Sequence, residues 1–198
     1  MESIVTIAEG SVRVDGERQD LYLGEMISLR NLLKLMLIES SNDAAYAIAS
    51  YAKSQGIDFV GMMNDKARAL EMKDSNFLDP AGLNDSALST VQDLIKLVEY
   101  SLNYEEIWDI SAEKTAIIES SDEKIVHTIK STNLLIGLIK GLVGGKTGYT
   151  DGAGQCLILV MGVPDYPSKI VSVVLGSNDR FGDTQKLVDW TRSAYRWE

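Results

Sequence analysis

The feature that most constrains this fold is a short segment with more apolar residues than one helix face can hold. From Ser28 onward, apolar residues recur at intervals of three and four, and others widen the stripe: Leu29, Leu32, Leu33, Leu35, Met36, Leu37 and Ile38. A run of this length is too short to span a bilayer, which takes about 20 residues. We therefore expect residues 28–38 to form a largely buried helix with Ser28 as its N-cap.

Further helix-start signals follow in the middle of the chain. Asp43 is the expected N-cap of an alanine-rich helix over residues 44–53, and Asp58 of a helix that runs to Leu70. Thr90 and Asp93 form a capping-box signature ahead of a helix that ends near residue 102. The sequence thus predicts a helical region over residues 28–110.

After Lys114 the pattern changes to short β-branched runs, which favour strands, at residues 115–120, 124–129, 155–163 and 169–176. Alternating runs at residues 3–7 and 11–16 also predict strands, and residues 183–197 predict a C-terminal helix. We expect one α/β domain over residues 1–198. In it, a helical region is followed by an antiparallel sheet and a covering C-terminal helix, which together span residues 115–198.

Charge and cysteine content exclude several classes of function. With 19 basic and 29 acidic residues the net charge is −10, which disfavours nucleic acid and anionic membranes as partners. The single cysteine, Cys156, permits no intrachain disulfide and no cysteine-based zinc site. It lies in an apolar run, so we expect it to be a buried core thiol. No apolar run is long enough to cross a membrane.

A glycine-rich stretch at residues 141–154, GLVGGKTGYTDGAG, raises the question of phosphate binding. If Gly145, Lys146 and Thr147 formed the end of a P-loop, its first glycine would have to be residue 140, which is Lys140. A helix should also begin at the lysine, yet more glycines follow it. Both the spacing and the context therefore argue against a nucleotide-binding loop.

Two motifs stand out together: Ser40-Ser41-Asn42 at a helix junction, and Lys146-Thr147-Gly148 ahead of the strand at 155–163. They resemble two of the three signatures of the penicillin-recognising serine enzymes, Ser-x-Asn and Lys-Thr-Gly. Successive blocks narrow the resemblance to the D-alanyl-D-alanine carboxypeptidases, the low-molecular-weight penicillin-binding proteins: LRNLLKLMLIESSNDAAYAIA, FVGMMNDKARALEMKDSNFLDPAGLND, STVQDLIKLVEYSL, STNLL, GGKTGYTDGAGQCL and VVLGSNDRF. The resemblance covers nearly the whole chain. It implies the β-lactamase/transpeptidase-like fold, with no metal and no organic cofactor.

The resemblance also implies roles for these residues. Lys146 and Thr147 offer a charge and a hydroxyl to the terminal carboxylate of a D-Ala-D-Ala peptide, while Gly148 lets substrate lie against the strand. Tyr149 is where the family places a backbone N–H of the oxyanion hole. Ser40 can relay a proton to the leaving nitrogen, and Asn42 can donate to a substrate carbonyl or accept from a lysine.

Each motif also has a purely structural interpretation. Ser40 and Asn42 are residue types that favour helix ends, and Lys146 could be a solvated lysine at the end of a strand. Only their occurrence together, within the flanking blocks, favours the catalytic interpretation.

The family's first signature, Ser-x-x-Lys, is absent from the 39 residues before Ser40. Three later matches begin at Ser50, Ser111 and Ser121. Ser50 lies too close to the second motif, and in the other two an acidic neighbour would raise the pKa of the lysine that should act as a base. We expect that the chain begins after the nucleophile, that the first strands of the sheet are also missing, and that the chain alone is inactive.

The expected function is that of a fragment of a serine-type D-Ala-D-Ala carboxypeptidase, whose parent trims peptidoglycan stem peptides through an acyl-enzyme outside the cytoplasm. The expected partners are a stem peptide ending in D-Ala-D-Ala and, for the parent, β-lactam antibiotics. A β-lactamase is an alternative, although no Glu-x-x-x-Asn motif lies between the two signatures. A non-catalytic peptidoglycan-binding or regulatory module of the same fold is another. His127 and Asp151 are expected to be a surface or packing residue and a turn residue, respectively.

Overall fold

The computed structural model describes residues 3–15, 19–163 and 165–196. The first described helix, α1 (Leu29–Lys34), continues directly into the π-helix η2 (Leu35–Glu39). The later helices are α2 (Asn42–Ser54), α3 (Phe59–Ala69), α4 (Val91–Ser101), α5 (Glu105–Ser111) and α6 (Arg180–Ala194). The 3-10 turn η1 (Glu9–Ser11) precedes them.

The apolar segment is buried as expected. Leu32, Leu35 and Ile38 are fully inaccessible to solvent, and the Ser28 hydroxyl caps the helix by accepting a hydrogen bond from the N–H of Asn31. The helix widens into a π turn before it stops, because the N–H of Ser40 bonds back five residues to the carbonyl of Leu35. This widening could not be predicted from the apolar pattern, and it determines where Ser40 lies.

The expected cap of the next helix is wrong. Ser41, not Asp43, is the N-cap of α2, and its hydroxyl accepts from the N–H of Ala44 at 3.2 Å. Asp43 is buried two residues later, in the first turn of α2, where its carboxylate accepts from the N–H groups of Val14 at 3.0 Å and Asp20 at 3.1 Å. The Asp43 carboxylate is occupied by backbone N–H donors of the N-terminal segment, so Ser41 caps the helix instead.

The other two predicted caps are confirmed. Asp58 accepts from the N–H of Gly61 at 3.0 Å at the start of α3, and Thr90 accepts from the N–H of Asp93 at 3.2 Å at the start of α4. Helix α6 begins three residues earlier than the predicted Asp183, because Asp179 is its N-cap. The earlier start places Arg180 in the first turn of this helix.

The strands of the described residues form three antiparallel sheets. Two are hairpin-like pairs, β1 (Ile4–Thr6) with β2 (Met26–Ser28) and β3 (Thr115–Glu119) with β4 (Val126–Lys130). The third has the order β5-β6-β7, from β5 (Leu142–Thr150), β6 (Gly154–Gly162) and β7 (Lys169–Ser177). Two expectations need correction. Residues 11–15 form no strand but a 3-10 end and a turn, and Lys146-Thr147-Gly148 lies inside strand β5 rather than before a strand.

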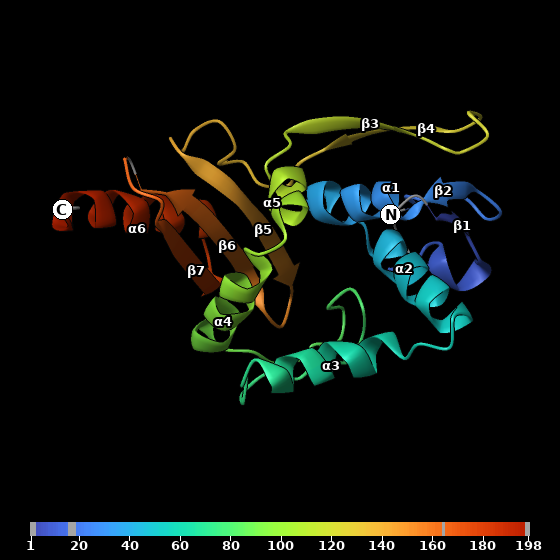
Figure 1. Cartoon of the computed structure of the whole chain (residues 1–198), viewed down its shortest axis with the longest axis horizontal. Helices are drawn as coiled ribbons and strands as arrows, with labels where there is room; N and C mark the ends of the chain where they lie inside the picture. The colour runs from blue at the N-terminus through green and yellow to red at the C-terminus, as the bar shows by residue number, and fades with distance from the viewer. Residues whose placement is uncertain (1–2, 16–18, 164, 197–198) are drawn as a thin grey trace.

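The central strand β6 explains why the sheet has helices on both faces. Its apolar residues alternate in direction, as in any strand. Leu157, Leu159 and Met161 pack with Val188 of α6, whereas Val160 packs with residues of α4 and α5, including Trp108. Figure 1 shows α6 on one side of the sheet and α4 and α5 on the other. The apolar run of β6 is continuous because both of its faces are buried.

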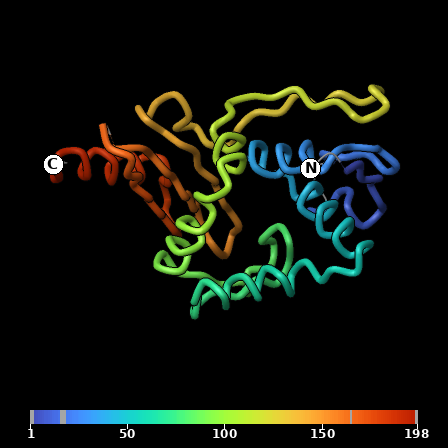
Figure 2. Tube along the Cα trace, viewed as in Figure 1, coloured from blue at the N-terminus to red at the C-terminus, as the bar shows by residue number. Residues whose placement is uncertain are grey.

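A second apolar cluster lies in the helical half of the molecule. It joins Leu32, Leu35 and Ile38 to Ile118 and Ile129 of the β3–β4 hairpin. Figure 2 shows the chain leaving this block through α2, running along α3, and returning through α4 and α5 to the sheet. The end of η2 and strand β5 therefore face one another although they are far apart in sequence. No helix among the described residues is long and apolar enough to cross a membrane.

Candidate active site

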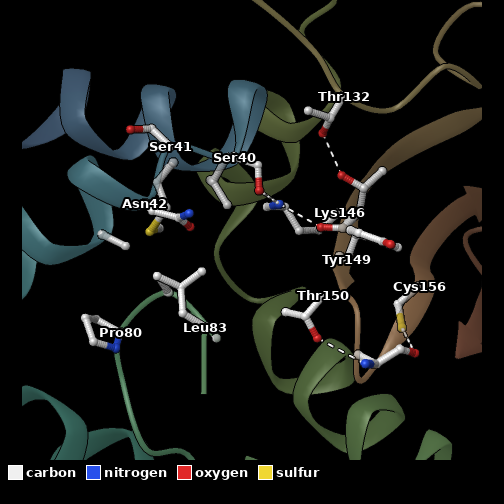
Figure 3. A pocket seen from close by; sticks show the side chains of 18 of the residues that line it. Ser40, Ser41, Asn42, Pro80, Leu83, Thr132, Lys146, Tyr149, Thr150 and Cys156 are labelled. Carbon is white, nitrogen blue, oxygen red and sulfur yellow. Dashed lines mark hydrogen bonds between the residues drawn. The ribbon is translucent and has the colours of Figure 1, made fainter. Parts of the chain in front are cut away.

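A pocket of about 570 Å³ lies between the helical block and the sheet. One wall is the junction of η2 and α2, the opposite wall is strand β5, and the loop at residues 80–83 closes one side (Figure 3). Its lining includes every candidate site residue from the sequence: Ser40, Asn42, Lys146, Thr147, Gly148 and Tyr149. The two motifs that the sequence separates by about 100 residues thus share one cavity.

The contact between the two motifs is direct. The ammonium of Lys146 donates to Ser40 Oγ at 2.6 Å and to the main-chain oxygen of Thr147 at 2.8 Å. Figure 3 shows the two side chains pointing toward one another across the pocket. Both side chains meet inside the pocket, so neither is merely a solvated end of its element.

Ser40 reaches this position through an unusual backbone conformation. It ends η2 with φ of 64° and ψ of 39°, in the left-handed region. For a residue with a side chain this conformation costs roughly 1 kcal/mol or more, and such strain concentrates at functional sites. The turn ends the helix and directs the hydroxyl into the pocket.

The electrostatics of the pocket favour an anionic ligand. Burial, and after it the nearby positive charge of Arg180, lower the pKa of Lys146 to about 8. Among the described residues, no Asp, Glu or His lines the pocket. Two cationic side chains without a carboxylate between them form a site that a bound carboxylate would stabilise.

Thr147 and Gly148 present different surfaces of β5. Thr147 is buried, and its hydroxyl lies 2.6 Å from the hydroxyl of Thr132. Gly148 lies on the exposed side, where an added Cβ would meet only Cys156 Cβ, at 3.6 Å. The protein itself would accommodate a side chain at Gly148, so the benefit of glycine there is access from the pocket. At Gly145, by contrast, a Cβ would lie 2.7 Å from the carbonyl of Ile158.

The backbone of Tyr149 lies on the free edge of the sheet. Among the described strands, β5 pairs with β6 along one edge only, and the carbonyl of Thr147 points from the other edge to Lys146. Main-chain groups two residues apart in a strand point to the same edge, so the N–H of Tyr149 also faces the pocket. Its side chain is exposed, and its hydroxyl donates to Asp151 at 2.9 Å.

Asn42 lines the same pocket, and its side chain bonds to the N-terminal segment. Its amide nitrogen donates to Asp15 at 3.3 Å, while the hydrogen bonds of the Lys146 ammonium go to Ser40 and Thr147. In the described part of the chain, Asn42 is therefore a wall residue and not a direct partner of Lys146.

Sequence reasoning missed two polar residues of this site. Arg180, at the start of α6, donates to the carbonyl of Gly148 at 2.9 Å, and its Nε is buried without a hydrogen-bond partner among the described residues. Thr132 links the two walls, because its N–H donates to the carbonyl of Ile38 at 3.1 Å while its hydroxyl meets Thr147. Both residues lie in recognisable blocks, but only the folded chain brings them to the pocket.

The expectation for Cys156 is wrong. The thiol is only partly buried and lines the pocket, with Sγ 3.7 Å from the carbonyl of Ala153. It lies on β6 beside Gly148 of β5. Because Gly148 has no side chain to cover it, the Cys156 thiol stays accessible from the pocket.

The loop at residues 79–84 is held in place by one carboxylate. Asp79 accepts from the N–H groups of Ala81 at 2.7 Å, Gly82 at 2.5 Å, Leu83 at 3.2 Å and Asn84 at 2.8 Å. Burial by itself would raise the pKa of Asp79, but these four donors outweigh it and lower the pKa. The carboxylate thus fixes the loop that carries Pro80 and Leu83 into the pocket.

None of the three later Ser-x-x-Lys matches lines the pocket. Ser50 is an exposed residue of α2, Ser121 is exposed in the turn between β3 and β4, and Ser111 is buried with its hydroxyl donating to the carbonyl of Trp108. Their positions agree with the prediction that they are not the nucleophile.

The two residues to which the sequence assigned no chemistry lie in structural positions. His127 Nε2 lies 2.6 Å from Glu25 Oε1, in the β3–β4 hairpin and outside the pocket lining. Asp151 lies in the turn after β5 and accepts from Tyr149. Both positions agree with the roles expected for them.

The sequence model of the D-alanyl-D-alanine carboxypeptidase family matches residues 1–179. Carboxypeptidase DacF of Bacillus subtilis is 30% identical over 200 residues, which are 98% of this chain and 50% of the relative. A D-alanyl-D-alanine endopeptidase of Pseudomonas aeruginosa is 32% identical over 94% of this chain and 60% of its own length. The chain therefore spans about half the length of the curated relatives it matches.

Solved structures agree on the fold. A D-alanyl-D-alanine carboxypeptidase from Mycobacterium tuberculosis superimposes with a TM-score of 0.83 at 24% identity, covering 97% of this chain and 74% of that one. Penicillin-binding protein D2 of Listeria monocytogenes, in an ampicillin-bound form, gives 0.76 at 29% identity, covering 95% and 76%. The fold is thus the α/β arrangement of the penicillin-binding and transpeptidase-like proteins, as expected. By its sequence match over residues 1–179, with this fold around the Ser40–Lys146 pocket, the chain belongs to the D-alanyl-D-alanine carboxypeptidase family.

Proposed function

We propose that this chain supplies the carboxylate-binding and proton-relay part of a serine-type D-Ala-D-Ala carboxypeptidase that acts outside the cytoplasm on peptidoglycan stem peptides. The observation that carries the proposal is the 2.6 Å contact between Lys146 Nζ and Ser40 Oγ, within a pocket whose described lining has two cations and no acid. This arrangement suits a ligand that ends in a carboxylate.

The terminal carboxylate of D-Ala-D-Ala is assigned to the region of Lys146, Thr147 and Arg180. Lys146 and Arg180 contribute charge, and Thr147 contributes a hydroxyl whose orientation Thr132 restricts. Gly148 lets the peptide lie along the free edge of β5, where the N–H of Tyr149 is available to a substrate carbonyl. Binding a carboxylate would stabilise the Lys146 ammonium, which reverses the effect of burial on its pKa.

Ser40 is assigned the proton relay. Its hydroxyl accepts from Lys146 and can donate to a leaving nitrogen, so a proton can pass from the ammonium through Oγ to the departing D-alanine. Acyl-enzyme formation in the whole protein needs a nucleophilic serine with its own base. No Ser-x-x-Lys match lines the pocket in the described part of this chain. We therefore expect this chain to bind such peptides with little or no hydrolysis.

β-Lactam antibiotics are the second class of proposed ligand. Their ring carboxylate offers the same anionic group, and the ampicillin-bound relative is a penicillin-binding protein. Here binding is expected to be reversible, with the carboxylate near Lys146 and Arg180.

The test is a titration of the chain with a diacetylated L-Lys-D-Ala-D-Ala tripeptide and with the same peptide amidated at its C-terminus. The backbone N–H signals of Thr147 and Tyr149 should shift in NMR spectra as the free-acid peptide is added. The C-terminally amidated peptide should bind at least about 10-fold more weakly, since a charged hydrogen bond contributes about 1.5–3 kcal/mol. The variant Lys146→Met should lose the preference for the free acid. Equal binding of the two peptides would contradict the proposal.

A further inference from the structure

We propose that Ser40 and Lys146 also form a nucleophile–base pair of their own, which attacks uncharged acyl and phosphonyl donors such as esters. This activity differs from the proposed peptide binding, in which Ser40 only relays a proton and Lys146 holds an anion. It is carried by the geometry of the two residues in the described chain, independently of any peptide ligand.

The first argument is the contact itself. Ser40 Oγ and Lys146 Nζ are 2.6 Å apart, within the range of a base and the hydroxyl that it activates. In the described chain the Ser40 hydroxyl has no other hydrogen bond, so no second partner competes for its proton. The neighbouring Ser41 is unsuited to the same role, because it is buried and its hydroxyl caps α2.

The second argument is the placement of the hydroxyl. The left-handed backbone of Ser40 (φ 64°) lifts its side chain off the end of η2 and into a cavity of about 570 Å³. A strained turn that presents a serine to a cavity is a recurrent feature of serine nucleophiles, because the strain is retained only where the surrounding structure enforces it. The apolar side chains of Met36, Leu37 and Leu83 in the lining suit an uncharged ligand.

The third argument concerns the state of the base. A lysine can accept a proton only in its neutral form, which burial and Arg180 favour by lowering the pKa of Lys146 to about 8. No Asp, Glu or His in the described lining of the pocket restores the charge. About a tenth of Lys146 is then neutral at pH 7, and most of it at pH 9.

The chemical step is a transfer without redox change. Neutral Lys146 Nζ takes the proton of the Ser40 hydroxyl as Oγ forms a bond to the acyl carbon or to phosphorus. The bond to the leaving group then breaks, and an alkoxide, phenolate or fluoride departs. An alkoxide can take the proton back from the Lys146 ammonium. The product is an acyl or phosphonyl ester on Ser40, with the N–H of Tyr149 on the adjacent free strand edge.

This mechanism predicts how the two functions of the pocket interact. A ligand that carries a carboxylate places a negative charge beside Lys146 and raises the pKa of the ammonium, which removes the neutral base. The diacetylated tripeptide should therefore inhibit labelling by an uncharged reagent. Failure of peptide binding alone would leave the labelling intact, so the two proposals can be tested separately.

The experiment is to treat the whole chain with an uncharged alkyl fluorophosphonate and to locate the adduct by peptide mass spectrometry. The adduct is expected on Ser40, at a rate that rises with pH and follows an apparent pKa near the 8 of Lys146. Ser40→Ala should abolish it. Ser121→Ala, at an exposed serine of a Ser-x-x-Lys match outside the pocket, should label like the wild type.

Lys146→Arg is the decisive variant, because arginine keeps the positive charge but cannot act as a base. It should lower the labelling rate at least about 100-fold, the usual contribution of a general base, and abolish the pH dependence. Circular dichroism checks that each variant folds, and the wild-type adduct map does not depend on any variant. No adduct on wild-type Ser40, an adduct mainly at other serines, or unchanged labelling of Lys146→Arg would each overturn the proposal.

Discussion

At the scale of single residues, Lys146 shows how burial prepares a lysine side chain to bind an anion. Its ammonium is held inside a pocket by two oxygen acceptors, Ser40 Oγ and the carbonyl of Thr147, and neither carries a charge. Hydrogen bonds to neutral acceptors do not repay the full cost of burying a cation. The folded protein therefore holds this proton less tightly than the unfolded chain does, and an anionic ligand can restore the balance.

This difference predicts a pH dependence of stability. The pKa of Lys146 falls from 10.5 in the unfolded chain to about 8 in the folded protein. Between these pH values the unfolded chain binds more protons than the folded protein does. The free energy of unfolding of the protein should therefore increase as the pH rises from 8 to 10.5. The increase from this residue is at most about 3 kcal/mol. Urea unfolding of the wild type and of Lys146→Met should diverge by that amount over this range, and parallel curves would contradict the prediction.

Arg180 should influence the same proton from the start of α6. Its positive charge is the second cause of the low pKa of Lys146, after burial. In Arg180→Gln the pKa of Lys146 should rise, which NMR of the lysine Cε and Hε signals can measure. The same variant should bind the free-acid tripeptide more weakly, by about 10-fold for one lost charged hydrogen bond. Arg192→Gln, at the far end of the same helix, is the matched control and should change neither quantity.

At the scale of elements, the sequence predicted most of what depends on neighbours in the chain. The caps Asp58 and Thr90 and the buried helix at 29–39 follow from residue type and spacing. The strands predicted from β-branched runs did not include β5, because glycines at positions 144, 145 and 148 lower strand propensity, and pairing with β6 forms the strand. The cap at Ser41 was missed because Ser41 and Asp43 are both suitable residue types, and the N-terminal segment occupies the carboxylate of Asp43.

The loop at residues 79–84 is an element whose shape depends on one side chain. In Asp79→Ala the N–H groups of Ala81, Gly82, Leu83 and Asn84 lose their common acceptor. We expect faster hydrogen exchange at these four amides, and a loss of about 1–3 kcal/mol in the free energy of unfolding. Asp79→Asn keeps one side-chain carbonyl oxygen, so its exchange rates and its free energy of unfolding should lie between those of the wild type and Asp79→Ala. Unchanged exchange in Asp79→Ala would show that the loop is held by other contacts.

At the scale of the whole molecule, the pocket lies at the interface between two apolar clusters. The helical cluster contains Leu35 and Ile38, the sheet cluster contains Leu157 and Leu159, and the site residues lie between them. That the two motifs meet could be inferred only from the family resemblance. The roles of Arg180 and Thr132 required the folded chain, because each depends on contacts between segments far apart in sequence.

A substitution at Thr132 can show whether the interface at the pocket depends on a side-chain contact or only on the backbone contact. Thr132→Val keeps the shape and the N–H that donates to Ile38, but it removes the hydroxyl that meets Thr147. Binding of the free-acid tripeptide should weaken about 5- to 10-fold, or about 1 kcal/mol, because the Thr147 hydroxyl loses its orientation. Thr132→Ser should restore binding. If Thr132→Val instead binds normally, the contact has no part in positioning Thr147.

The contact between Ser40 and Lys146 joins residues that are 106 positions apart. Closing a loop of that length has an entropic cost that local helices and hairpins do not bear, so this contact should be among the last to form during folding. A reagent that labels Ser40 would then report completed refolding, and a newly synthesised chain would stay unreactive until strand β5 had docked against the end of η2.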